Sequence, residues 1–132
     1  MNTHQTEIKV RYGETDQMGV VYHGNYAQYL EIGRLEWLEA IGIYYIEMEA
    51  NEVMLPVASM TLKFTKSAIY GDILTVSTTL LKRPTASIEF AYEIHNSSGE
   101  LLTTAYTKLA FVNMKSNLPM RCPQYILDEL QI

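Results

Sequence analysis

The sequence lacks several features that define common functional classes. It has one cysteine, Cys122, among its 132 residues, which excludes an internal disulfide and a cysteine-rich metal site. No apolar run is long enough to span a membrane, and the N-terminal segment MNTHQTEIKV has no apolar stretch typical of a signal peptide. We therefore expect a cytoplasmic protein with no integral membrane association.

Positive charge is scarce, and two catalytic motifs are missing. The chain has 10 Lys and Arg against 15 Asp and Glu, and the net charge of −5 argues against nucleic-acid binding. It has no Gly-x-Ser-x-Gly nucleophile motif and no Gly-rich phosphate loop, and Cys122 lies in a proline-flanked tail that argues against a papain-like thiol. With 48% hydrophobic and 19% charged residues, residues 1–132 are expected to form a single globular domain.

The most informative stretch is residues 11–42, RYGETDQMGVVYHGNYAQYLEIGRLEWLEAIG. It reads as a strand end, then a polar loop with Asp16 and His23, then a helix over 26–41. The helix is predicted by an apolar stripe at spacings of three and four, formed by Tyr26, Leu30, Gly33, Trp37 and Ile41. Gly33 on this stripe reflects either a close contact with a sheet or no specific constraint. An acid and an imidazole beside a helix start form a candidate reaction centre, because the helix end offers unpaired N–H donors and partial positive charge.

The remainder of the chain is predicted to be mostly strands. Alternating or β-branched patterns predict strands at 7–12, 59–65, 73–82, 87–95 and 101–113, with short helices at 43–50 and 124–130. Hairpin-length turns between the later strands imply an antiparallel sheet, with the first strand at an edge. Since the helix at 26–41 is the long element available to cover it, we predict an α+β fold with a curved sheet wrapped around one central helix.

The loop and helix carry the motif T-D-x-x-G-V-V-Y-H-G-N-Y-x-x-Y-L-E at residues 15–31. In this motif and in its order of elements, the chain resembles the hotdog-fold thioesterases. It is most similar to the 4-hydroxybenzoyl-CoA thioesterase type and, within it, to the acyl-CoA thioesterases associated with the bacterial Tol-Pal system. The resemblance covers nearly the whole chain and implies a hotdog fold with a five-stranded antiparallel sheet. It also implies hydrolysis of acyl-CoA to acid and CoA, with no metal and no cofactor beyond the CoA of the substrate.

The resemblance further implies a homodimer or homotetramer with active sites at subunit interfaces. In the family the acid at the position of Asp16 is catalytic. In the Tol-Pal type the histidine at the position of His23 and the tyrosine at the position of Tyr12 are also implicated in catalysis. The 4-hydroxybenzoyl enzyme has tyrosine where this chain has His23 and proline where it has Gly24, so its aryl specificity does not carry over.

Thioester chemistry explains why these residue types suit the reaction. The carbonyl oxygen becomes anionic when the thioester is attacked, and N–H groups around His23, Gly24 and Asn25 are candidate donors to it. Asp16 would act either as a general base or as a nucleophile, and the sequence leaves both open. The alternatives are structural: Asp16 as a turn residue, His23 as a polar residue near the helix start, and Tyr12 as a core residue at a strand end. Met60, like Trp37, is expected in the core.

Substrate contacts are expected from aromatic and basic side chains. The acyl group is expected to lie against the apolar helix face, and basic residues are expected near the CoA phosphates. The candidate binding residues are Tyr22, Asn25, Tyr26, Tyr29, Lys66 and Arg83. Two alternative functions remain open, a hotdog hydratase or dehydratase and a non-catalytic module that binds acyl-CoA or acyl carrier protein.

Overall fold

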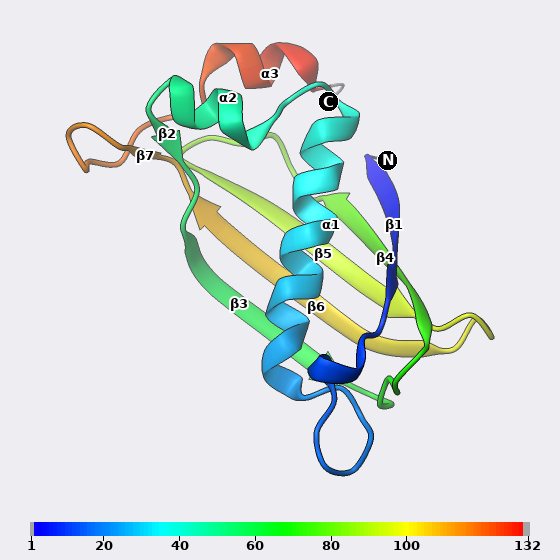
Figure 1. The fold of residues 1–132 in the computed structure, drawn as a ribbon. Helices are drawn as coiled ribbons and strands as arrows, with labels where there is room; N and C mark the ends of the chain where they lie inside the picture. The colour runs from blue at the N-terminus through cyan, green and yellow to red at the C-terminus, as the bar shows by residue number, and fades with distance from the viewer. Residues whose placement is uncertain (1, 131–132) are drawn as a thin grey trace.

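The computed structural model describes residues 2–130, and its long elements form one sheet and one long helix (Figure 1). The strands are β1 (Thr3–Lys9), β2 (Val53–Met54), β3 (Val57–Phe64), β4 (Ile73–Leu80), β5 (Ser87–His95), β6 (Leu101–Ala110) and β7 (Val112–Asn113). The helices are α1 (Tyr26–Ala40), α2 (Tyr45–Ala50) and α3 (Gln124–Glu129), and the 3-10 turns are η1 (Tyr12–Glu14) and η2 (His23–Asn25). No helix in this part of the chain is long and apolar enough to cross a bilayer.

The main sheet has five antiparallel strands in the order β1-β4-β5-β6-β3. Strand β1 lies at one edge and β3 at the other, so the predicted fold class and the edge position of the first strand are confirmed. The alternation in β5 buries Ile88, Phe90, Tyr92 and Ile94 on the inner face, and the β5–β6 hairpin turns at 96–99 as expected.

Helix α1 crosses the inner face and packs on β1 and β4 (Figure 1). Its predicted stripe is buried from Tyr26 to Trp37, with Leu30 fully inaccessible and Trp37 2% exposed, whereas Ile41 follows the end of the helix and is partly buried. Gly33 lies against the sheet so closely that an added Cβ would be 2.7 Å from Thr78 Oγ1 and 3.0 Å from Val76 Cγ1. The glycine therefore sets a close approach between helix and sheet, which decides the question that the sequence left open.

Three details differ from the sequence-based expectations. Strand β1 ends at Lys9, and Tyr12 lies in η1 with 76% of its surface exposed, so the expected core position of Tyr12 is wrong. Met60 is 42% exposed, because α1 packs mainly on β1 and β4 and reaches β3 at its other end, where Tyr26 packs on Phe64. The strand predicted at 101–113 is interrupted at Phe111, and its end pairs as β7 with the unpredicted β2 in a separate two-stranded sheet.

Candidate active site

The loop that carries Asp16 is a small hairpin attached directly to the start of α1. Thr15 and Val21 form an antiparallel bridge across its base, and Val20 bridges to Ile69. At the tip, Gly19 has a φ of 80°, a left-handed conformation that glycine adopts without a steric penalty. Because His23 follows Val21 by two residues, the loop returns Asp16 to the neighbourhood of the helix start.

Asp16 is exposed and is held by hydrogen bonds within its own loop. Its Oδ1 accepts from the N–H groups of Met18 at 2.8 Å and, more weakly, Val20 at 3.4 Å. Its backbone N–H donates to the Val20 carbonyl at 2.8 Å. These contacts fix the carboxylate relative to the loop, and the position of the loop relative to α1 must be set by other contacts.

The helix start has a more specific donor arrangement than the sequence suggested. The N–H of Asn25 donates to the Tyr22 carbonyl at 2.9 Å, and the N–H of Tyr26 bonds the His23 carbonyl. Asn25 is thus not available as a donor to an oxyanion. Among residues 2–130, no backbone hydrogen bond is found for the N–H groups of His23 and Gly24, which leaves these two as the candidate donors.

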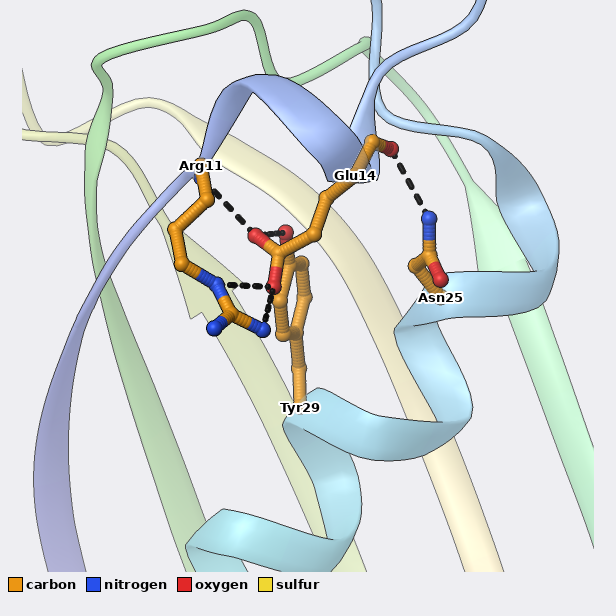
Figure 2. Close-up of polar contacts among 4 residues, drawn as sticks. All are labelled: Arg11, Glu14, Asn25 and Tyr29. Atoms are coloured by element: carbon orange, nitrogen blue, oxygen red, sulfur yellow. Dashed lines mark hydrogen bonds and ion pairs between the residues drawn. The ribbon is translucent and has the colours of Figure 1, made fainter.

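Asn25 occupies the N-cap position of α1, but its side chain does not cap the helix. Its Nδ2 instead donates to the carbonyl oxygen of Glu14 at 2.8 Å (Figure 2). Asn25 therefore joins the helix start to the chain just before the Asp16 loop, and this is the only side-chain hydrogen bond found for it in the described region.

His23 and Tyr12 are both exposed near the loop. The His23 ring lies on Tyr22, with ring centroids 4.4 Å apart, and Tyr12 packs edge-on against Tyr70 at 5.7 Å. Within residues 2–130, no hydrogen bond joins either side chain to the Asp16 carboxylate. The structure thus places the three predicted catalytic side chains at one end of the molecule, with no hydrogen bond among them in the described region.

Gly24 is positioned against an aromatic ring. A Cβ at this residue would be 2.6 Å from Cε2 of Tyr22, so a side chain here requires the Tyr22 ring to move. Tyr22 itself is 51% exposed and remains accessible to a ligand at the helix start.

Tyr26 and Tyr29, in contrast, are buried with their hydroxyl groups engaged. The Tyr26 hydroxyl accepts a long hydrogen bond of 3.4 Å from the Ala68 N–H, and the Tyr29 hydroxyl donates to Glu14 Oε1 at 2.9 Å. Burial first, then the Glu14 carboxylate, raises the pKa of Tyr29 well above its usual range, so the phenol stays protonated. A cavity of about 310 Å³ does lie between α1 and the sheet, but further along the helix, lined by Arg34, Leu35, Leu38, Tyr45, Phe90 and Leu109 among others.

The two basic candidates do not form one patch. Lys66 follows β3 and pairs with Glu100 at the loop end of the sheet. Arg83 follows the C-terminal end of β4, at the opposite end of the sheet, where its positive charge lowers the pKa of the Cys122 thiol against the larger effect of burial. Since an eight-residue strand spans roughly 26 Å, one phosphate group cannot contact both side chains.

Glu14 is the residue of this region that sequence reasoning missed. It is 7% exposed, although it lies in a polar run between the exposed Gly13 and the half-buried Thr15. Its carboxylate accepts hydrogen bonds from the Arg11 backbone and side chain and from Tyr29 (Figure 2). The three-residue spacing of Arg11 and Glu14 was the one sequence signal of a contact between them. No sequence signal indicated the contact with Tyr29, which lies fifteen residues away.

Two other kinds of site find no support in the described region. No group of three or more His, Cys, Asp or Glu residues there could hold a metal ion. Cys122 is buried, and this burial raises the pKa of its thiol to about 11, so little thiolate exists at neutral pH.

A family model described as the thioesterase-like superfamily matches residues 10–130. The chain belongs to this superfamily. Among its relatives, YneP of Bacillus subtilis, whose name assigns it as an acyl-CoA thioesterase, is 35% identical over 121 residues, covering 92% of this chain and 88% of YneP. The acyl-CoA thioester hydrolase YbgC of Escherichia coli is 28% identical over 94% of this chain and 92% of its own length.

The solved structures agree with this assignment. The DHNA-CoA thioesterase of Staphylococcus aureus superposes with a TM-score of 0.90 at 37% identity, over 96% of this chain and 85% of that one. Nearly the whole chain, including the Asp16 loop and the start of α1, is therefore built on the hotdog thioesterase fold.

Proposed function

We propose that this member of the thioesterase-like superfamily hydrolyses an acyl-CoA thioester to the free acid and CoA. The observation that carries the proposal is the arrangement at the start of α1, where an exposed carboxylate lies on a short hairpin next to two N–H groups without backbone partners. The similarity to YneP and YbgC over nearly the full chain supports the same reaction.

The arrangement accounts for the two requirements of thioester hydrolysis. The carbonyl oxygen of the substrate would lie against the N–H groups of His23 and Gly24, where one donor to the developing oxyanion is worth roughly 3–4 kcal/mol. Asp16 would then either deprotonate a water molecule or attack the carbonyl carbon itself to form a mixed anhydride. Because hydrolysis needs no redox or group-carrier chemistry, no cofactor besides the substrate's CoA is required. We also propose that the reaction takes place in the cytoplasm.

The acyl group is proposed to bind beside α1 in an oligomer. Tyr22 is the accessible aromatic residue at the helix start, with Tyr26 and Tyr29 buried behind it. Strand β3 has an unpaired edge and exposes Met60 and Phe64, so a second copy of the chain is the expected cover, in a homodimer or a dimer of dimers. If kcat/KM were the same for every acyl length from short to long, a defined acyl pocket would be ruled out.

The test replaces Asp16 by Asn, which keeps the size and most hydrogen bonds of the side chain but removes its charge. We expect unchanged folding and a fall in kcat of about 100-fold or more, the low end for loss of a general base. Asp128→Asn is the control, because Asp128 is also an exposed aspartate that accepts a hydrogen bond, from Gln124 Nε2 at 2.8 Å, but it lies on α3, away from the loop.

The assay is thiol release from a panel of acyl-CoAs and from one acyl carrier protein thioester. Near-normal turnover of Asp16→Asn would remove the central claim. Binding of acyl-CoA without thiol release would favour the binding module, and loss of an enoyl double bond without thiol release would favour a hydratase.

A further inference from the structure

Glu14 lies at the foot of the Asp16 loop with its carboxylate turned inward (Figure 2). Oε1 accepts a hydrogen bond from the Arg11 N–H at 2.9 Å and from the Tyr29 hydroxyl at 2.9 Å. Oε2 accepts from Nε of Arg11 at 3.1 Å and from Nη2 at 3.0 Å. Each carboxylate oxygen thus has two donors. Three of the four belong to Arg11, which follows β1, and the fourth is the Tyr29 hydroxyl of α1.

The backbone carbonyl of Glu14 makes a second group of contacts. It accepts the Tyr22 N–H at 2.9 Å and the Asn25 Nδ2 at 2.8 Å. Tyr22 is the residue at which the chain leaves the loop, and Asn25 is the residue before α1. One residue therefore ties the outgoing and returning ends of the loop to each other and to the helix.

The charge on Glu14 suits this role. Burial alone would raise the pKa of the carboxyl group, but the Arg11 backbone N–H, the Tyr29 hydroxyl and the Arg11 guanidinium together hold it below its usual value. The Arg11 side chain is 77% exposed, so the ion pair itself contributes little, and the backbone and phenol donors dominate. Glu14 is consequently an ionised acceptor at neutral pH.

We propose that Glu14, acting through Tyr29 and Arg11, is the positioning residue of the reaction centre, which holds the Asp16 loop in register with the N–H groups of His23 and Gly24. The role of Asp16 in this statement rests on the function proposed above. The hydrogen bonds found for Asp16 lie within its loop, so its distance from the helix start depends on how the loop is attached. Glu14 joins the two ends of the loop to each other and to the helix start, and Val20 and Val21 make a second attachment, to residues 68 and 69. A displacement of about 1 Å at a reacting group costs on the order of 100-fold in rate.

The chain offers a matched control for this network. Glu89, on the outer face of the sheet, accepts from the Tyr106 hydroxyl at 2.7 Å and pairs with Lys82 at 2.9 Å. It has the same combination of a phenol and a cation on one carboxylate, but it is remote from the loop.

The first experiment compares Glu14→Gln and Tyr29→Phe with Glu89→Gln and Tyr106→Phe. We expect kcat to fall by about 10- to 100-fold in the first pair with KM changed by less than about threefold, and to stay unchanged in the second pair. Rates are measured well below the unfolding temperature and divided by the folded fraction. A normal kcat in Glu14→Gln, or a fall that follows the unfolded fraction alone, would overturn the proposal.

A double-mutant cycle separates positioning from general damage. If Glu14 acts by placing Asp16, adding Glu14→Gln to the Asp16→Asn protein should cost less than about twofold in residual rate. A loss in the double variant as large as in Glu14→Gln alone would show that Glu14 does not act through Asp16.

A readout without substrate keeps the two proposals apart. Hydrogen exchange at the Met18 and Val20 amides, which bind Asp16, should quicken by about 10-fold or more in Glu14→Gln, while exchange in β5 stays unchanged. If the protein cleaved no thioester but Glu14→Gln still quickened exchange in the loop, the proposed function would be wrong and the proposed anchoring of the loop by Glu14 would be supported. Unchanged exchange in the loop would refute the anchor whatever the activity.

Discussion

Glu14 shows how a small domain keeps a charge inside with little penalty. A buried carboxylate is costly when its lone pairs lack donors, and here both oxygens have two each. The three-residue spacing of Arg11 and Glu14 in RYGETD indicates at most an ion pair, and it does not predict burial, because a polar run next to a glycine is typical of a solvent-exposed loop. The decisive partner, Tyr29, belongs to another element, so only the tertiary structure brings the two together.

This carboxylate should make stability depend on pH in the acid range. Because the pKa of Glu14 is lowered by folding, its contribution is complete above the ordinary glutamate pKa and is lost as the pH falls through the lower native value. The free energy of unfolding of the wild type should therefore fall more steeply than that of Glu14→Gln between about pH 5 and pH 3. Urea titrations across this range measure both slopes, and parallel curves would contradict the prediction.

The catalytic candidates were easier to predict than their geometry. Asp16, His23 and Gly24 are placed at the helix start as the motif suggested, because a loop that opens directly into a helix has few ways to close. Tyr12 was misplaced because the alternation of β1 continues in the sequence beyond Lys9, where the chain turns into η1. Their roles in catalysis remain predictions.

At the scale of elements, α1 and β5 match the sequence closely because each carries a long, regular apolar period. The pair β2 and β7 was missed because a two-residue strand contains no period to detect. The exposure of Met60 was missed for a different reason. Apolar and polar residues do alternate along β3, but this alternation does not show whether another element covers the inner face at that strand.

The contact at Gly33 leads to a test of helix–sheet packing. Alanine is favoured over glycine in a helix by about 1 kcal/mol, but the new Cβ would overlap Thr78 Oγ1. We expect Gly33→Ala to lower the free energy of unfolding by about 1–3 kcal/mol, as measured by denaturant titration.

Two controls accompany this variant. Gln28→Ala, at an exposed site on the same helix, should change stability by less than about 0.5 kcal/mol. Adding Thr78→Ala to Gly33→Ala should recover part of the loss, because it removes the nearer of the two contacts. A Gly33→Ala protein more stable than wild type would show that the helix moves away from the sheet without cost.

At the scale of the whole molecule, the inner face of the sheet is buried along β1, β4, β5 and β6 but exposed along β3. Helix α1 packs on β1 and β4, whereas β3 has an open edge and exposes Val57, Met60 and Phe64. An apolar strand edge of this kind tends to pair with another chain, so a second copy is the simplest cover.

Assembly can be tested with one charge. In light scattering at micromolar concentration, the wild type should have a mass that is a multiple of the 15.1 kDa protomer mass, and Met60→Lys should have the mass of one protomer. The variant should also lose turnover. Ile46→Lys, at a residue 76% exposed on α2, should leave the mass unchanged. A wild-type protein that is already a monomer at this concentration would defeat the oligomer proposal.

The buried state of Cys122 has a practical consequence for the activity measurements. A coloured thiol reagent reports the CoA released during turnover, and the folded enzyme should add no background because its single thiol is 6% exposed and has a pKa of about 11. Once denaturant is added, each chain contributes one equivalent of colour. The same cuvette can therefore count turnovers first and enzyme molecules afterwards, so every variant carries its own internal concentration standard.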